Sequence, residues 1–289
     1  MAVTLKPAER ILAGYALVVL TVSLARVPAY PAARWAVAAH AGVLLLLFLF
    51  VVRDRTPEFG RLGWLRPVAP ILLLLALYGS LDLLSGFGAR PTHDALVLRW
   101  ERQLFDGEPG REWWQAYPSS LWSTVLHAAY LSYYVIVPAP VALFLLRGQS
   151  RHRDRAMVAI LAAFVACYLC FVFFPVAGPY YEYPRPAAWF VDNWAARAVY
   201  GVLSGGSSYG AAFPSSHVAA AWAAAFACWW GSRKAAAVLT VAAALLTVSV
   251  VYCQMHYAID ALAGLAVALV ATAIAWWSYP NERRNARDN

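Results

Sequence analysis

Residues 156–175 read AMVAILAAFVACYLCFVFFP, a run of twenty residues that carries no charged side chain. An α-helix needs about 20 consecutive apolar residues to cross the hydrocarbon core of a bilayer. The rest of the chain has a similar character, because 62% of its 289 residues are hydrophobic and only 13% are charged. A soluble domain carries roughly 25% charged residues. The sequence therefore predicts an all-α protein that crosses the membrane several times.

Eight apolar segments are long enough, or nearly so, to span a bilayer. They lie at roughly 10–27, 35–52, 67–85, 120–146, 156–175, 214–231, 234–252 and 255–278. The connections at 86–119 and 176–213 are long, and loops of this length are usually functional or disordered. Within the first connection, apolar residues recur at helical spacing over 94–105, so we expect a helix in the membrane interface. We expect His93 and Asp94 to lie in a solvated loop.

The distribution of basic residues indicates how the chain is oriented. If the N-terminus is inside, most of the 23 Lys and Arg residues fall in inside loops, as the positive-inside rule requires. Both termini are then cytoplasmic, and the two long connections lie on the extracytoplasmic side. The net charge of +8 follows from these loops rather than from one basic face, so we expect no nucleic-acid partner.

The stretch FPSSHVAAAW at 213–222 opens one of the apolar segments. Pro214 is favoured at the first position of a helix, which would place Ser215, Ser216 and His217 in the first turn. The free N–H groups and the dipole at that end of a helix favour an anion such as phosphate. In the orientation above, this helix starts at the outer face. The alternative is a capped helix with an incidental histidine.

The stretch QMHYAID at 254–260 contains the second candidate group. His256 and Asp260 are four residues apart, so on a helix they would share a face. A carboxylate on one imidazole nitrogen fixes the tautomer and stabilises the cation, which leaves the other nitrogen free to attack. A structural pair buried between helices is the alternative. Since both helices start outside, His217 can meet this pair across one phosphate, with one histidine attacking and the other protonating the leaving oxygen.

The sequence offers no obvious metal site. Cys167 and Cys170 form a C-x-x-C, but it lies within an apolar run, so we interpret both as packing residues. We therefore expect no metal and no cofactor. Positive charge for a phosphate would then come from arginine and from backbone N–H groups.

These histidine stretches resemble motifs of the type 2 phosphatidic acid phosphatase superfamily of lipid phosphate phosphatases. The family motifs are K-x6-R-P, P-S-G-H and S-R-x5-H-x3-D. The resemblance implies a phosphatase-type catalytic core of six transmembrane helices at 67–278. It also implies two accessory helices within 1–66 and a cytoplasmic tail at 279–289.

The resemblance implies roles for three residues and differs from the family pattern in others. His256 would be the nucleophile, Asp260 its partner, and His217 the acid for the leaving group. The R-P of the first motif aligns with Arg185–Pro186, which places Gly178 where the family has lysine. Val250 stands where the third motif has arginine, and the second motif has Ser216 in place of glycine.

The pattern around the third motif is similar to the inositol phosphorylceramide synthase-like branch, as is the upstream stretch ERQLFDGEP at 101–109. Members of that branch include lipid phosphotransferases. Arg185 is the first choice for binding the phosphate, and Arg90, Arg99 or Arg102 could compensate for the missing charges.

We expect the substrate to be bound by Arg185, Ser215, Ser216, Tyr181 and Asp82. Asp82 could bind hydroxyl groups of a polyol headgroup, or it could make a structural hydrogen bond. Tyr181 could line a headgroup pocket, or it could anchor the chain at the interface as tyrosines often do.

The expected protein is a metal-independent membrane enzyme. It would transfer a phosphoryl group from a lipid phosphate or phosphodiester, through a phosphohistidine, to a lipid hydroxyl or to water. A broad-specificity lipid phosphate phosphatase is one alternative, a proton-coupled transporter is another, and a structural scaffold is a third. The expected partners are the lipid phosphate, the bilayer and a lipid or polyol acceptor, with no required protein partner. We expect a multi-pass plasma-membrane protein with an extracytoplasmic active site.

Overall fold

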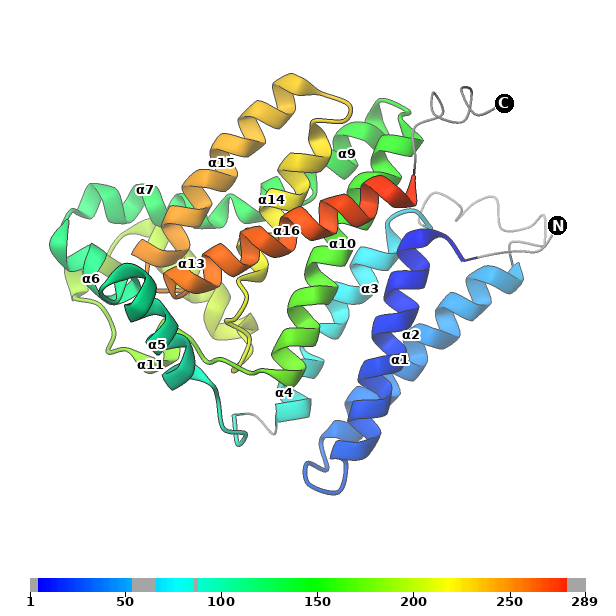
Figure 1. Cartoon of the computed structure of the whole chain (residues 1–289), viewed down its shortest axis with the longest axis horizontal. Coiled ribbons are helices and arrows are strands. Elements are labelled where there is room, and N and C mark those ends of the chain that lie inside the picture. The colour runs from blue at the N-terminus through cyan, green and yellow to red at the C-terminus, as the bar shows by residue number, and fades with distance from the viewer. Residues whose placement is uncertain (1–4, 54–65, 86–87, 280–289) are drawn as a thin grey trace.

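A computed structural model describes residues 5–53, 66–85 and 88–279 of the chain. Within these ranges every regular element is a helix (Figure 1). One isolated β-bridge joins Val176 to Ala211. The expected all-α architecture is confirmed for this part of the protein. The expected tail beyond residue 279 lies outside the described residues. So do Arg55 and Arg61, which lie between the first two expected spans and the third and count among the basic residues expected inside.

Five of the described helices are long and apolar enough to cross a membrane. They are α1 (Pro7–Arg26), α2 (Ala33–Arg53), α10 (Ser150–Phe173), α15 (Arg233–Tyr252) and α16 (Ala258–Ser278). A sixth forms if α7 (Ser120–Leu131) and α8 (Tyr133–Ile136) are joined to α9 (Ala139–Leu146), although the chain bends there by 41°. The protein is therefore a multi-pass membrane protein.

The structure has fewer full-length spans than the eight expected ones. The segment at 67–85 is broken into α3 (Ala69–Leu77) and α4 (Ser80–Ser85). The segment at 214–231 forms only α14 (Ser216–Cys228), whose 13 residues span about 20 Å against a hydrocarbon core of about 30 Å. The irregular chain that leads to α14 is enclosed by protein, as shown by buried Ser208 and Ala212. Irregular backbone is tolerated at membrane depth only where protein or a water-filled cavity surrounds it.

The core of the bundle is built on α10, which packs against α14, α16, α9 and α1. Most of α14 consists of buried alanines, and small residues allow helices to approach closely. The two helices α14 and α16 approach closely at Gly264 of α16, where an added Cβ would lie 2.6 Å from the carbonyl oxygen of Ser215. This contact fixes the start of α14 against the first turns of α16.

The N-terminal helices α1 and α2 form a hairpin at one side of the bundle (Figure 1). The hairpin packs on α10 through α1 and on α4 through α2. Its description as an accessory unit within 1–66 stays a prediction.

Short helices gather near the end of the bundle where α15 ends and α16 begins (Figure 1). They are α5 (Asp94–Phe105), α6 (Pro109–Ala116), α11 (Pro179–Glu182), α12 (Ala188–Val191) and α13 (Trp194–Gly206). The helix expected over 94–105 is confirmed as α5, and these elements surround the turn that carries His256.

Candidate active site

His217 lies in the first turn of α14, as the sequence predicts. Ser215 is the N-cap of this helix, and its Oγ accepts a hydrogen bond from the backbone N–H of Val218 at 3.4 Å. The prediction that Pro214 opens the helix is wrong, because Pro214 precedes the cap. The backbone N–H of Ser215 also donates to the carbonyl oxygen of Asp260 at 3.0 Å. The start of α14 is thereby tied directly to α16.

Two tyrosines, Tyr130 of α7 and Tyr133 of α8, contact the ring of His217. A hydrogen bond of 3.0 Å joins the hydroxyl of Tyr130 to Nε2 of His217. The ring of Tyr133 lies 4.4 Å from the imidazole, centroid to centroid. The buried Nδ1 has no hydrogen-bond partner within the described part of the chain. Nδ1 is therefore the nitrogen of His217 that is left for a ligand.

His256 lies in the turn between α15 and α16, not on a helix as the sequence reasoning assumed. Asp260 is in the first turn of α16, and its Oδ2 accepts a hydrogen bond from the backbone N–H of Tyr257 at 2.9 Å. This turn brings Nδ1 of His256 to 3.4 Å from the same Oδ2. The pairing therefore arises from the cap of α16 rather than from spacing along one helical face.

The two imidazoles lie next to each other although they are far apart in the sequence. Their ring centroids are 5.7 Å apart, and the planes make an angle of 62°. One tetrahedral group can contact both rings at this separation. Burial lowers the pKa of His256 to about 4, opposed by the backbone carbonyl of Ala212, so this imidazole is neutral at pH 7.

A buried carboxylate from the interfacial helix holds the start of α16. The two carboxylate oxygens of Glu101 accept hydrogen bonds from the N–H groups of Ala258 at 3.1 Å and Ile259 at 2.9 Å. These are first-turn N–H groups, which have no partner inside the helix. Burial raises the pKa of Glu101 to about 7, although both N–H groups favour the carboxylate. Sequence reasoning missed this residue.

Asp94 is a second buried carboxylate on the same face of α5. It accepts hydrogen bonds from the N–H groups of Ala177 at 2.9 Å and Gly178 at 2.8 Å, and from the hydroxyl of Tyr257 at 3.0 Å. The expectation of a solvated loop here is wrong, because Asp94 is buried and the ring of His93 stacks on Phe174. The spacing of Asp94 and Glu101 with buried Val97 was the available signal.

Gly178 occupies the position where the family motif has lysine. Its φ is +85°, a conformation that side chains disfavour, and an added Cβ would lie 2.7 Å from the Cβ of Ala212. The missing lysine therefore has a structural reason, since no side chain fits at this position without movement of the loop.

Arg185 is exposed and packs on tyrosines rather than on the histidines. Its guanidinium lies 4.6 Å from the ring of Tyr180 and 5.0 Å from the ring of Tyr200, and it donates a hydrogen bond to the hydroxyl of Tyr180. The preceding residue, Pro184, accepts a hydrogen bond from the side chain of Gln254 at 2.9 Å. Arg185 is thus connected to the turn that carries His256.

Two of the other candidate arginines have partners elsewhere in the described chain. Arg90 donates to the carbonyl oxygen of Val172 at 2.9 Å, and Arg102 pairs with Glu108. Arg99 is exposed on α5.

Asp82 and Tyr181 both contact the loop that leads to α14. Oδ1 of Asp82 accepts hydrogen bonds from the hydroxyl of Ser208 at 2.9 Å and the N–H of Tyr209 at 3.1 Å. The hydroxyl of Tyr181 is 2.6 Å from that of Ser207. The contacts of Asp82 match the structural alternative for this residue.

Metal ligands do not cluster in the described ranges, where no group of three or more His, Cys, Asp or Glu side chains could hold a metal ion. Cys167 is buried and Cys170 is half-buried, and both are free thiols.

Comparison with known protein families matches residues 95–274 to the model described as the PAP2 superfamily. The matched stretch covers more than half of the chain and includes His217, His256 and Asp260. No curated protein and no solved structure matches the chain.

Proposed function

Because the chain belongs to the PAP2 superfamily, we propose that His217, His256 and Asp260 form the active site of a lipid phosphoryl-transfer enzyme. Membership implies phosphatase or phosphotransferase activity on phosphate substrates. The observation that carries the proposal is the approach of the two imidazoles to 5.7 Å, with the carboxylate of Asp260 beside one of them.

The first half of the reaction transfers the phosphoryl group to His256. Nδ1 of His256 faces Asp260, so the other nitrogen, Nε2, attacks phosphorus with its lone pair. The bond between phosphorus and the leaving oxygen breaks, and that oxygen takes a proton from His217. The carboxylate of Asp260 stabilises the positive charge that develops on His256.

The second half returns the enzyme to its starting state. His217 removes a proton from water or from a lipid hydroxyl, and the resulting oxygen attacks the phosphohistidine. The bond between phosphorus and Nε2 of His256 then breaks. Since Tyr130 engages Nε2 of His217, we assign both proton transfers to Nδ1 of that residue.

Negative charge on the phosphate requires nearby donors. The first-turn N–H groups at Ser216 and His217 supply hydrogen-bond donors and the positive end of the α14 dipole. We propose Arg185 as the cation, because its loop is bonded to Gln254 two residues before His256.

The proposal also concerns the molecule that accepts the phosphoryl group. The similarity of the stretch at 101–109 to the inositol phosphorylceramide synthase-like branch favours a phosphotransferase with a lipid or polyol acceptor. Hydrolysis to a free phosphate uses the same three residues, with water as acceptor. The excess of basic residues in the expected inside loops supports an extracytoplasmic site, and we propose that the membrane is the plasma membrane.

The proposed activity is tested with detergent-purified full-length protein, a panel of lipid phosphates and phosphodiesters, and a metal chelator. Product masses distinguish water from a lipid hydroxyl as acceptor. His256→Ala and His217→Ala should each lower kcat by about three orders of magnitude or more. His152→Ala, at a half-buried histidine in α10, is the matched control and should retain turnover. Comparable rates in all three variants would rule out this active site.

A further inference from the structure

The hydroxyl of Tyr130 reaches one nitrogen of His217 from a helix that is distant in the sequence. Tyr130 lies near the end of α7, and its side chain is buried, with 2% of the residue exposed. Its hydroxyl is 3.0 Å from Nε2 of His217. A buried hydroxyl needs a hydrogen-bond partner and cannot turn to solvent for one, so this bond is a fixed feature of the site.

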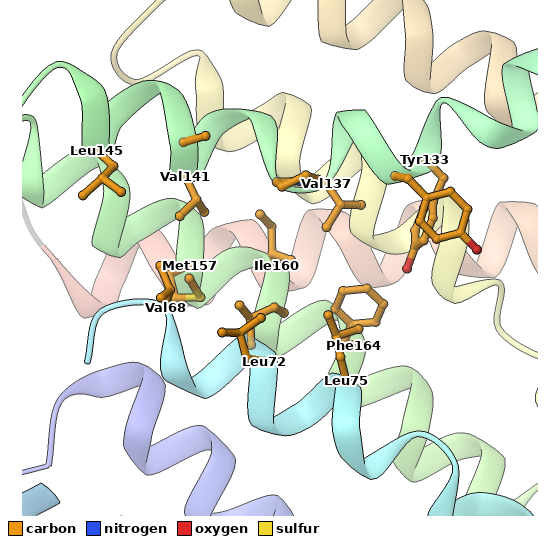
Figure 2. A pocket seen from close by; sticks show the side chains of 14 residues that line it. Val68, Leu72, Leu75, Tyr133, Val137, Val141, Leu145, Met157, Ile160 and Phe164 are labelled. Atoms are coloured by element: carbon orange, nitrogen blue, oxygen red, sulfur yellow. The ribbon is translucent and has the colours of Figure 1, made fainter. Parts of the chain in front are cut away.

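Two aromatic rings restrict the orientation of the imidazole. The ring centroid of His217 is 4.9 Å from that of Tyr130 and 4.4 Å from that of Tyr133. Tyr133 in turn lines an apolar pocket together with Val137 and Phe164 (Figure 2). Packing against both rings limits rotation of the imidazole, and the bond to Tyr130 determines which of its two nitrogens is held.

The direction of this hydrogen bond decides what Nδ1 of His217 can do. A neutral imidazole carries one proton, and a tyrosine hydroxyl can either donate or accept. If the hydroxyl donates to Nε2, the neutral ring carries its proton on Nδ1, which then cannot act as a base. If the hydroxyl accepts from Nε2–H, Nδ1 has a free lone pair in the neutral ring and carries a proton in the imidazolium. The second arrangement allows Nδ1 to give a proton to the leaving oxygen and later to take one back.

We propose that Tyr130 is a positioning residue, whose hydroxyl accepts a hydrogen bond from Nε2–H of His217 and keeps Nδ1 available for both proton transfers. This inference rests on the proposed function and adds how the acid and base of that site is prepared. In the first half of the reaction, the proton on Nδ1 passes to the leaving oxygen while Nε2–H stays bonded to Tyr130. In the second half, Nδ1 takes the proton of water or of the lipid hydroxyl. Tyr130 itself gains and loses no proton.

The two histidines then have orienting partners of different charge. The carboxylate of Asp260 lies 3.4 Å from Nδ1 of His256, whereas the partner of His217 is a neutral phenol. A negative charge stabilises an imidazolium by direct attraction, and a phenol lacks that charge. The carboxylate therefore suits the histidine that becomes positively charged when it carries the phosphoryl group. The phenol suits the histidine that must release its proton.

The test compares two substrates whose leaving groups differ in their need for a proton. The alkyl oxygen of a lipid phosphate is a poor leaving group and needs the proton of His217, whereas p-nitrophenolate leaves without one. Tyr130→Phe removes the hydroxyl and keeps the ring, so kcat/KM for the lipid phosphate should fall by about tenfold. Since kcat/KM covers the steps up to transfer onto His256, its value for p-nitrophenyl phosphate should stay within about twofold of the wild type.

The matched control is Tyr15→Phe on α1. Tyr15 is also 2% exposed, and its buried hydroxyl has no hydrogen-bond partner within the described part of the chain. This variant should retain both values of kcat/KM. A double variant gives a second check, because Tyr130→Phe should cause no further loss once His217 is replaced by alanine.

Two results in Tyr130→Phe would overturn the inference. One is an unchanged kcat/KM for both substrates, and the other is an equal loss on both, which indicates a purely structural role. If the variant does not fold, ¹⁵N NMR of the histidine-labelled wild-type protein, assigned with His217→Ala, decides the question. Neutral His217 should carry its proton on Nε2, and a proton on Nδ1 would contradict the proposal. Failure of the proposed function looks different, because the wild-type protein would then turn over neither substrate.

Discussion

His256 is held neutral by its surroundings, and this property suits a nucleophile. Burial lowers its pKa to about 4, from an ordinary value near 6.5. An imidazole must be unprotonated to attack phosphorus, so the attacking form persists down to about pH 4. Activity limited by this group should be lost as the pH falls through about 4, not through 6.5.

A pH profile of kcat/KM measures this property in the free enzyme. A phosphodiester substrate is preferred, because its phosphate has no second ionisation near neutral pH. Circular dichroism at each pH serves as the control for unfolding. An acid limb with its midpoint near 6.5 would show that His256 is not the neutral buried group described here.

Gly178 can be compared with Gly148 to distinguish the cost of backbone strain from the cost of a steric clash. Gly178→Ala places a Cβ 2.7 Å from the Cβ of Ala212 at a φ of +85°. Gly148 also has a positive φ, of +66°, but a Cβ there meets nothing within 4 Å. Gly178→Ala should therefore cost more stability than Gly148→Ala, whose strain alone is worth about 1 kcal/mol.

Thermal unfolding in detergent compares the two variants. The expected result is a clearly lower Tm for Gly178→Ala, with reduced turnover because Ala212 lies in the loop that leads to α14. Equal values of Tm would mean that the loop at 176–178 can move to accommodate a side chain. The absence of the lysine would then need another explanation.

At the scale of elements, the helix α5 determines where α16 begins. Glu101 accepts hydrogen bonds from the N–H groups of Ala258 and Ile259, and Asp94 accepts one from the hydroxyl of Tyr257. Both carboxylates act on the turn between His256 and Asp260. The interfacial helix therefore holds the turn that carries the proposed nucleophile.

Glu101→Gln tests this positioning. The amide keeps one acceptor oxygen but turns its NH₂ group toward a backbone N–H. The unpaired N–H should lower the free energy of unfolding by about 1–3 kcal/mol. The folded pKa of Glu101 is raised to about 7, so ionisation destabilises the folded protein as pH rises from about 4.5 to 7. Glu101→Gln should therefore flatten the pH dependence of Tm in that window and lower kcat with little change in KM.

Arg99→Gln, at an exposed position of α5, provides the control for a charge change on the same helix. It should leave the pH dependence of Tm as in the wild type. A pH dependence of Tm in Glu101→Gln that equals the wild-type one would contradict the role of this carboxylate.

At the scale of the whole molecule, composition was enough to predict a multi-pass membrane protein, and the local motifs singled out two histidines that the structure brings together. A chain with 62% hydrophobic and 13% charged residues can hardly fold as a soluble domain. The stretches around His217 and His256 each carry their own signal, and the hairpin of α15 places them at the same end of the bundle.

Other features depend on tertiary contacts that apolar runs do not encode. The segment at 214–231 appeared long enough to span, but Ser215 caps α14 and the preceding loop folds into the protein. Asp94 was expected in a solvated loop and Glu101 was not singled out, because nothing local shows that their partners include backbone N–H groups from distant segments. The loop of Arg185 is likewise positioned by Gln254, seventy residues away.

The most direct measurement is the location of the covalent phosphate during turnover. Full-length protein is mixed with a lipid phosphate, quenched rapidly under alkaline conditions, and digested for peptide mapping by mass spectrometry. The account predicts phosphohistidine on the peptide that contains His256, absent from His256→Ala and persisting longer in His217→Ala. A phosphate on His217, or turnover without any phosphohistidine, would contradict it.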